Sequence, residues 1–248
     1  NRLMSSVIST YGEIEFSNKK KVFDQEEKKN KISKKNYELI EKLEDIDKWL
    51  NEAEENGEIA VDTETSSLDP HQANLVGISF STKIGKACYI PIGHTQGKNL
   101  EEKKVIKKIK PVLEDKSIKK IGQNIKFDFI IFYHKGINMN SMEDTMLMSY
   151  VLDAGKNRHN MDVLSEIHLG HKTISFKDIV GTGKKQINFS EVKIDIAKDY
   201  AAEDADITFR LYKVFSKNIK LEKMLNIYEI FEKPLIKILA LMEIHGVQ

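Results

Sequence analysis

The hydrophobic positions along the chain predict a helix, then a run of strands, then mostly helices. Four apolar residues are spaced as one face of an amphipathic helix that Asn56-Gly57 ends: Leu43, Ile46, Trp49 and Leu50. Three short apolar runs come next, at 59–61, 75–81 and 87–92. Since these runs follow one another closely, we expect three neighbouring strands that pair antiparallel.

The remainder of the chain shows helical periodicity with one more strand. Helices are predicted at 100–115, 128–135, 144–152, 161–169, 194–220 and 230–244, and a short strand at 118–122. Pro111 lies inside the first of these helices, where we expect a kink or a new turn. Strands early, helices late and a β–α–β unit between them are typical of an α/β domain. We expect a mixed central sheet with an early antiparallel three-strand run, flanked by helices.

Composition narrows the class of protein without indicating a function. The chain has 248 residues, of which 40% are hydrophobic and 31% charged, which suits one or two domains with a buried core. No apolar run approaches the ~18 residues that a membrane span needs, and the N-terminus lacks a secretory signal pattern. The single cysteine, Cys88, excludes a disulfide scaffold and a cysteine-based zinc site. We therefore expect a soluble, intracellular, globular protein.

Charge is balanced overall, at +1, but it is unevenly distributed. Residues 17–36 carry eight lysines and three acids and have few large apolar side chains. They predict a flexible linker, with a nucleic-acid-binding arm as the alternative. Residues 1–16 look like the tail of something upstream, because they contain apolar residues in a segment too short to fold alone. The body that remains is slightly acidic, so its carboxylates need an explanation.

Two acids directly follow the first apolar strand. Asp62 and Glu64 are two residues apart, so in a strand their side chains point to the same face. Like charges at the end of a buried strand repel each other and are costly to desolvate. A divalent cation with oxygen ligands relieves both costs. Taken alone, the pair also fits a solvated strand end.

Two further places carry acids in an unusual setting. Asp128 follows the other short strand, where it would begin or cap a helix. Tyr200 and Asp204 are four residues apart in a helical stretch and share a face, whereas Glu203 and Asp206 are expected to point elsewhere, into solvent. The strand-end acids, the helix-start aspartate and the Tyr-x-x-x-Asp pair together predict a two-metal phosphoryl-transfer site.

Three motifs in this order resemble those of the 3′–5′ exonucleases with a DEDD carboxylate set, in the subgroup with tyrosine in the third motif. They are VDTETSSLD at 61–69, GQNIKFDF at 122–129 and YAAEDAD at 200–206. Residues 158–189 are also similar to the corresponding segment of the proofreading domains of the bacterial DNA polymerase I family. The resemblance implies the ribonuclease H-like exonuclease fold.

The resemblance implies roles for individual residues as well. Asp62, Glu64 and Asp204 would hold the tighter of two divalent cations, and Asp62 would bridge to the second with help from Asp128. Glu64 and Tyr200 would position the attacking water. The ions would be Mg²⁺ or Mn²⁺, with Zn²⁺ as an alternative at the tighter site. Contacts to the last nucleotides are implied for Thr65, Leu68 (a wedge against the terminal base), Gln123, Asn124 and Phe127 (more often tyrosine in the family), and contacts to the DNA strand for Arg158 and Phe189.

The implied function is hydrolysis of single-stranded or frayed DNA 3′ ends to 5′-mononucleotides, as the proofreading module of a polymerase in replication and repair. The implied parts are the tail of a 5′-nuclease domain (1–16), a Lys-rich linker (17–36), the exonuclease domain (37–229) and the start of a polymerase domain (230–248). No polymerase active site is expected in the chain. We expect a cytoplasmic, nucleoid-associated monomer without a membrane partner. The alternatives are an RNA-processing exonuclease with the same chemistry and a catalytically silent module, against which the intact carboxylates argue.

Overall fold

The computed structural model of the chain describes residues 36–246. The predicted upstream tail at 1–16 and all but the last residue of the predicted linker lie outside the described residues. Among the residues that are described, no helix combines the length and apolar character that crossing a lipid bilayer requires.

Six strands form one mixed sheet in the order β1-β4-β3-β2-β5-β6. Strands β2, β3 and β4 pair antiparallel, as the sequence predicts, whereas β1–β4, β2–β5 and β5–β6 are parallel pairs. The strands are β1 (Tyr37–Leu39), β2 (Glu58–Thr65), β3 (Leu75–Lys83), β4 (Lys86–Pro91), β5 (Lys119–Gly122) and β6 (Met142–Asp144). The edge strands β1 and β6 were not predicted, because three residues are too few to show an alternating pattern.

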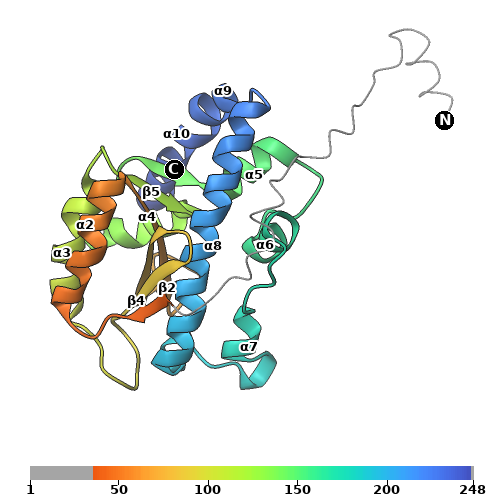
Figure 1. The fold of residues 1–248 in the computed structure, drawn as a ribbon. Coiled ribbons are helices and arrows are strands. Elements are labelled where there is room, and N and C mark those ends of the chain that lie inside the picture. The colour runs from red at the N-terminus through yellow and green to blue at the C-terminus, as the bar shows by residue number, and fades with distance from the viewer. Residues whose placement is uncertain (1–35, 247–248) are drawn as a thin grey trace, which may run out of the picture. The chain divides into compact units, whose positions relative to one another are not determined.

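Helices cover both faces of this sheet (Figure 1). They are α2 (Ile46–Asn56), α3 (Glu102–Glu114), α4 (Ile125–His134), α5 (Thr145–Asp153), α6 (Met161–Leu169), α7 (Phe176–Val180), α8 (Ile194–Leu221), α9 (Leu225–Ile227) and α10 (Lys233–His245), with a π-helical turn η6 at Tyr228–Glu232. Helices α2, α3, α4 and α10 share one core cluster, and α8 packs across the other face of the sheet.

Alternation along β2 explains how one strand serves both layers. Ile59 and Val61 belong to the core beneath α2, α3 and α4, while Ala60 belongs to the cluster under α8. Side chains two residues apart share a face. The strand therefore continues past Ala60 with every second residue directed toward α8.

Three local features of the helices test the sequence prediction. Gly57 ends α2 with φ of 68°, which confirms the predicted stop. Pro111 lies within α3, which continues as one helix to Glu114 rather than opening a new turn. Helix α4 begins at Ile125, three residues earlier than predicted, because the left-handed Asn124 turns the chain directly out of the preceding strand. Asp128 is therefore one turn inside the helix and does not cap it.

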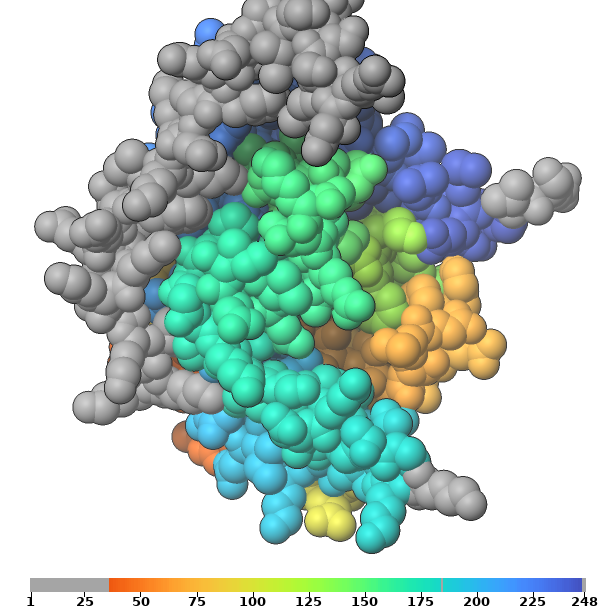
Figure 2. All heavy atoms as spheres, turned by 90° about the vertical axis from the view of Figure 1, so that its right-hand side faces the viewer, coloured from red at the N-terminus to blue at the C-terminus, as the bar shows by residue number. Residues whose placement is uncertain are grey.

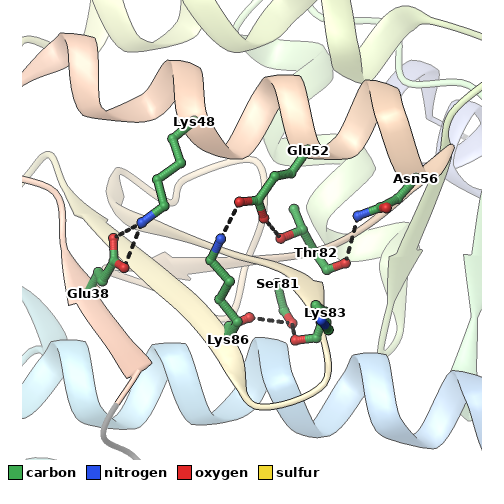
Figure 3. A network of polar contacts seen from close by, with 8 residues as sticks. All are labelled: Glu38, Lys48, Glu52, Asn56, Ser81, Thr82, Lys83 and Lys86. Atoms are coloured by element: carbon green, nitrogen blue, oxygen red, sulfur yellow. Dashed lines mark hydrogen bonds and ion pairs between the residues drawn. The ribbon is translucent and has the colours of Figure 1, made fainter.

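A polar network fastens α2 to the β3–β4 hairpin and to β1 (Figure 3). Lys48 donates to Glu38 at 2.7 Å, and Glu52 accepts from Thr82 at 2.7 Å and from Lys86. These bonds join one helix to three strands along the sheet edge far from β6.

Candidate active site

The carboxyl end of β2 places two acids on the face that α8 covers. Asp62 is half-buried and Glu64 is 7% exposed. Glu64 pairs with Gly77 of β3, where a Cβ would lie 2.1 Å from the hydroxyl of Tyr89. Glycine at that position is thus required for the buried Tyr89 ring to lie beside Glu64.

Helix α8 supplies the third carboxylate. Its small residues Ala197, Ala201, Ala202 and Ala205 are buried against the sheet, so the helix axis lies close to the strands. Asp204 comes from the same side of the helix, and carboxylate oxygens of Asp62, Glu64 and Asp204 all lie within 4.8 Å of one another. The hydroxyl of Tyr200, which lies one helical turn earlier, donates a hydrogen bond to Asp204.

Asp128 approaches from α4, on the other side of β2. One of its oxygens accepts hydrogen bonds from the backbone N–H and the hydroxyl of Thr63, at 2.9 and 2.6 Å. Thr63 stands between Asp62 and Glu64, so these bonds fix Asp128 beside the strand-end acids. Asp128 is not one of the three clustered carboxylates, but it lines the same cavity.

Burial and mutual repulsion perturb this group of acids strongly. Desolvation raises the pKa of Asp62 to about 7. Burial, followed by the charges of Asp62, Asp204 and Asp128, holds the pKa of Glu64 well above its usual range. Burial and then the charge of Asp62 raise the pKa of both Asp128 and Asp204. Burial and these carboxylates also raise the pKa of Tyr200, so its phenol stays protonated and can donate a hydrogen bond.

The donor set fits a hard divalent cation. Three carboxylates offer oxygens from positions close enough to share one ion. Within the described residues, Glu64 Oε1 is buried without a hydrogen-bond partner, which is costly unless a positive charge lies beside it. Concentrated perturbation of this kind is typical of functional sites.

A cavity of about 560 Å³ opens above these acids. Figure 2 shows this face of the molecule hollowed between the loop after β2 (orange) and the α6–α7 segment (teal). Six of the seven predicted substrate contacts line the cavity: Thr65, Leu68, Gln123, Asn124, Phe127 and Phe189. Leu68 is 93% exposed. Arg158 is the exception, since it is exposed but is not among the described residues that line the cavity.

Sequence reasoning missed Phe176. This residue lines the cavity, is 41% exposed, and stacks on Phe189 with the ring planes 5° apart. Its ring also lies 6.1 Å from that of Tyr200. The signal for it was weak, because a single aromatic in a short helix between polar loops has no periodic pattern.

The structure corrects the prediction that Glu203 and Asp206 are solvated. Glu203 is 1% exposed, accepts from the backbone N–H of Ile174 at 2.6 Å, and lies 3.0 Å from His171 Nε2. Asp206 is fully buried and accepts from Tyr37, Gly85 and Arg210. Helix α8 is covered by the sheet on one side and by the segment after α6 on another. The acids of α8 that point away from the site are therefore buried against other parts of the protein instead of being exposed to water.

Residues 37–220 match the model of a family described as 3′–5′ exonuclease. DNA polymerase I of Rhizobium leguminosarum is 40% identical over 232 residues, covering 85% of this chain and 23% of that protein. DNA polymerase I of Pseudomonas aeruginosa is 37% identical over 257 residues, covering 97% and 28%. The chain thus spans about a quarter of the length of these relatives.

Solved structures resemble the fold at lower identity. Brucella melitensis NrnC superimposes with a TM-score of 0.59 at 24% identity, covering 75% of this chain and 83% of that one. The POL domain of Pol1 from M. smegmatis, in complex with DNA primer-template and dNTP, superimposes with a TM-score of 0.64 at 15% identity, covering 83% of this chain and 31% of that one. The catalytic core of RRP6 from Trypanosoma brucei gives 0.59 at 15%, with 83% and 51% covered. These likenesses confirm the expected fold class, the ribonuclease H-like exonuclease fold.

Proposed function

The chain belongs to the 3′–5′ exonuclease family that its residues 37–220 match, and we propose that it is the proofreading exonuclease domain of a DNA polymerase I. It hydrolyses single-stranded or frayed DNA 3′ ends and releases 5′-mononucleotides. The observation that carries this proposal is the meeting of Asp62, Glu64 and Asp204 within 4.8 Å at the floor of an open cavity, with Tyr200 beside them.

Two divalent cations, Mg²⁺ or Mn²⁺ with Zn²⁺ as an alternative at the tighter site, belong to the proposed mechanism. Asp62, Glu64 and Asp204 would hold one, and Asp62 with Asp128 would hold the other. Bound ions of this kind make water a usable nucleophile at neutral pH and stabilise the leaving oxygen.

The side chains orient the reactants. Glu64 would accept a hydrogen bond from the attacking water, and the Tyr200 hydroxyl, which burial keeps protonated, would contact the same water. The water oxygen bonds to the terminal phosphorus, and the bond from phosphorus to the 3′ oxygen of the preceding nucleotide breaks. The water gives up a proton to solvent and the departing 3′ oxygen takes one up, so a 5′-mononucleotide leaves and the shortened strand ends in a new 3′ hydroxyl.

The walls of the cavity suit an unpaired end. Leu68 projects into solvent above the acids, and Phe127, Phe176 and Phe189 offer aromatic faces along the cavity. Stacking of bases on such faces tolerates any sequence. A base can reach them only after leaving the duplex, which costs least at a mismatch. This difference favours removal of misincorporated nucleotides.

We place the domain in a longer protein, because the relatives that it resembles are about four times its length. Residues 1–16 would end a 5′-nuclease domain, 17–36 would be the linker, 37–229 the exonuclease domain, and 230–248 would lead into a polymerase domain in cis. The protein would act as a cytoplasmic monomer at the nucleoid, with the 3′ end of single-stranded DNA as its partner.

A nuclease assay tests the proposal. A 5′-labelled single strand, a blunt hairpin of matched sequence and the equivalent RNA are incubated with Mg²⁺ or with a chelator. We expect shortening from the 3′ end, faster on single-stranded DNA than on the hairpin or the RNA, and none with the chelator. Asp204→Asn should be inactive, whereas Asp195→Asn, an exposed acid on the same helix, should match the wild type. A preference for RNA would favour the alternative of an RNA-processing exonuclease. Inactivity in both Mg²⁺ and Mn²⁺ would favour the alternative of a catalytically silent module.

A further inference from the structure

A buried carboxylate outside the cavity ties together the starts of two helices. Asp144 is the last residue of β6 and is 1% exposed. It accepts from the backbone N–H groups of Met146 and Leu147 in α5, at 2.8 and 3.3 Å. It also accepts from those of Asn124 and Ile125 at the start of α4, at 3.1 and 3.0 Å. Helix starts leave N–H groups unpaired and carry partial positive charge, so one carboxylate satisfies both.

The start of α4 depends on Asp144 for its cap. Asn124, which precedes the helix, has φ of 62° and ψ of 46°, a conformation that residues other than glycine seldom adopt. Its own side chain makes no capping bond. The helix that is fixed in this way carries Phe127 and Asp128 to the cavity, so the direction of α4 decides where they lie.

The C-terminal helical segment holds Asp144 from the opposite side. Tyr228, in η6, is 1% exposed, and its hydroxyl accepts from the backbone N–H of Asp144 at 2.9 Å. The same hydroxyl donates to Glu143 at 3.0 Å, and the other oxygen of Glu143 accepts from Lys233 of α10 at 2.6 Å. A continuous set of hydrogen bonds thus leads from α10 through Tyr228 and Asp144 to the start of α4.

We propose that Asp144 is a positioning residue of the exonuclease site and that Tyr228 keeps it in place, so that the segment 228–245 controls the placement of Asp128. The proposal rests on the proposed function, because it concerns the efficiency of that same site. Asp128 must meet both hydrogen-bond donors of Thr63, and a shift of α4 by about 1 Å would break that fit.

Hydrogen exchange of the metal-free protein gives a test that needs no activity. The variants are Tyr228→Phe, which removes one hydroxyl, and Asp144→Asn, which removes the charge. Tyr212→Phe is the control, since Tyr212 is also buried and its hydroxyl accepts from Lys119 at 3.2 Å. We expect the amides of Asn124 and Ile125 to exchange about fivefold faster or more in both variants, relative to amides of α8. The control should leave them unchanged.

Steady-state kinetics on single-stranded DNA gives the second readout. Per folded molecule, kcat should fall roughly 10–100-fold with KM nearly constant, as expected when a residue that orients the site is lost. A purely structural role would lower the melting temperature without changing kcat per folded molecule. The proposal is overturned if exchange at 124–125 rises no more than in α8, or if kcat matches that of the control. An inactive wild type would defeat the proposed function, while the exchange result would still decide the positioning role.

Discussion

Replacing Asp204 with asparagine is expected to stabilise the metal-free protein while it abolishes hydrolysis. The oxygens of Asp204, Asp62 and Glu64 lie within 4.8 Å of one another. At that separation two unit charges repel by about 3.5 kcal/mol for an effective dielectric constant of roughly 20. Asparagine has nearly the same size and keeps an oxygen for the Tyr200 hydroxyl, so the change removes charge with little loss of packing.

Proton uptake limits the size of this gain. Burial and the charge of Asp62 raise the pKa of Asp204 above its ordinary value of 3.8. Keeping Asp204 protonated at a pH above 3.8 costs about 1.4 kcal/mol of folding free energy per pH unit, or roughly 4 kcal/mol near neutrality. The wild type can therefore avoid the repulsion at this cost, which is the most that the substitution can gain. We therefore expect the free energy of unfolding to rise by roughly 2–4 kcal/mol near pH 8.

The sign of the pH dependence follows from the raised pKa values. Between the ordinary and the raised pKa, the folded protein binds more protons than the unfolded chain, so wild-type stability falls as pH rises. The variant lacks one such group, so its stability falls less as the pH rises. Its advantage should be full above the raised pKa values, such as the value of about 7 for Asp62, and should vanish as pH falls toward the ordinary carboxyl value.

Urea unfolding followed by circular dichroism measures this effect, with chelator at about pH 5 and about pH 8. Added Mg²⁺ should reverse the order of stability, because an ion that binds only the folded state stabilises the wild type more than the variant. Asp195→Asn serves as the control, as in the nuclease assay. The charge argument fails if Asp204→Asn is less stable than the wild type at the higher pH in chelator, or if Mg²⁺ stabilises both equally.

Three further predictions concern single residues around the site. Leu68→Ala should change the free energy of unfolding by less than about 0.5 kcal/mol, because the side chain is 93% exposed, but should raise KM for single-stranded 3′ ends in the nuclease assay. Gly77→Ala should destabilise by about 3 kcal/mol in urea unfolding, since its Cβ would lie 2.1 Å from the Tyr89 hydroxyl; near-wild-type stability would contradict the packing described. Asp206→Asn should cost about 3 kcal/mol in the same measurement, because it leaves the partly buried Arg210 without its charge partner, and a neutral result would mean that this pair contributes no stability.

Local spacing was enough to predict much of the fold and part of the site. The antiparallel run β2–β4 and most helices followed from periodicity that lies within one segment. Asp62 and Glu64 share a face because a strand repeats every two residues, and Tyr200 and Asp204 share one because a helix repeats every 3.6. The resemblance of three short motifs and of residues 158–189 to a known family added seven predicted substrate contacts, of which Arg158 alone does not line the cavity.

Packing between distant segments decided the rest. The sequence could not reveal that α8 is buried on several sides, so Glu203 and Asp206 were wrongly expected in solvent. The sequence also gave no indication that Phe176 or Asp144 belongs to the site or supports it, because their contacts are with residues outside their own helix or strand.

The sequence by itself therefore determined which acids share a face within one strand or one helix, because such relations follow from backbone geometry. Only the tertiary structure brought β2, α4 and α8 to one place, through sheet pairing and through small residues that let α8 lie close to the strands. The burial that perturbs the carboxylates arises only from that assembly, since desolvation depends on every surrounding segment at once.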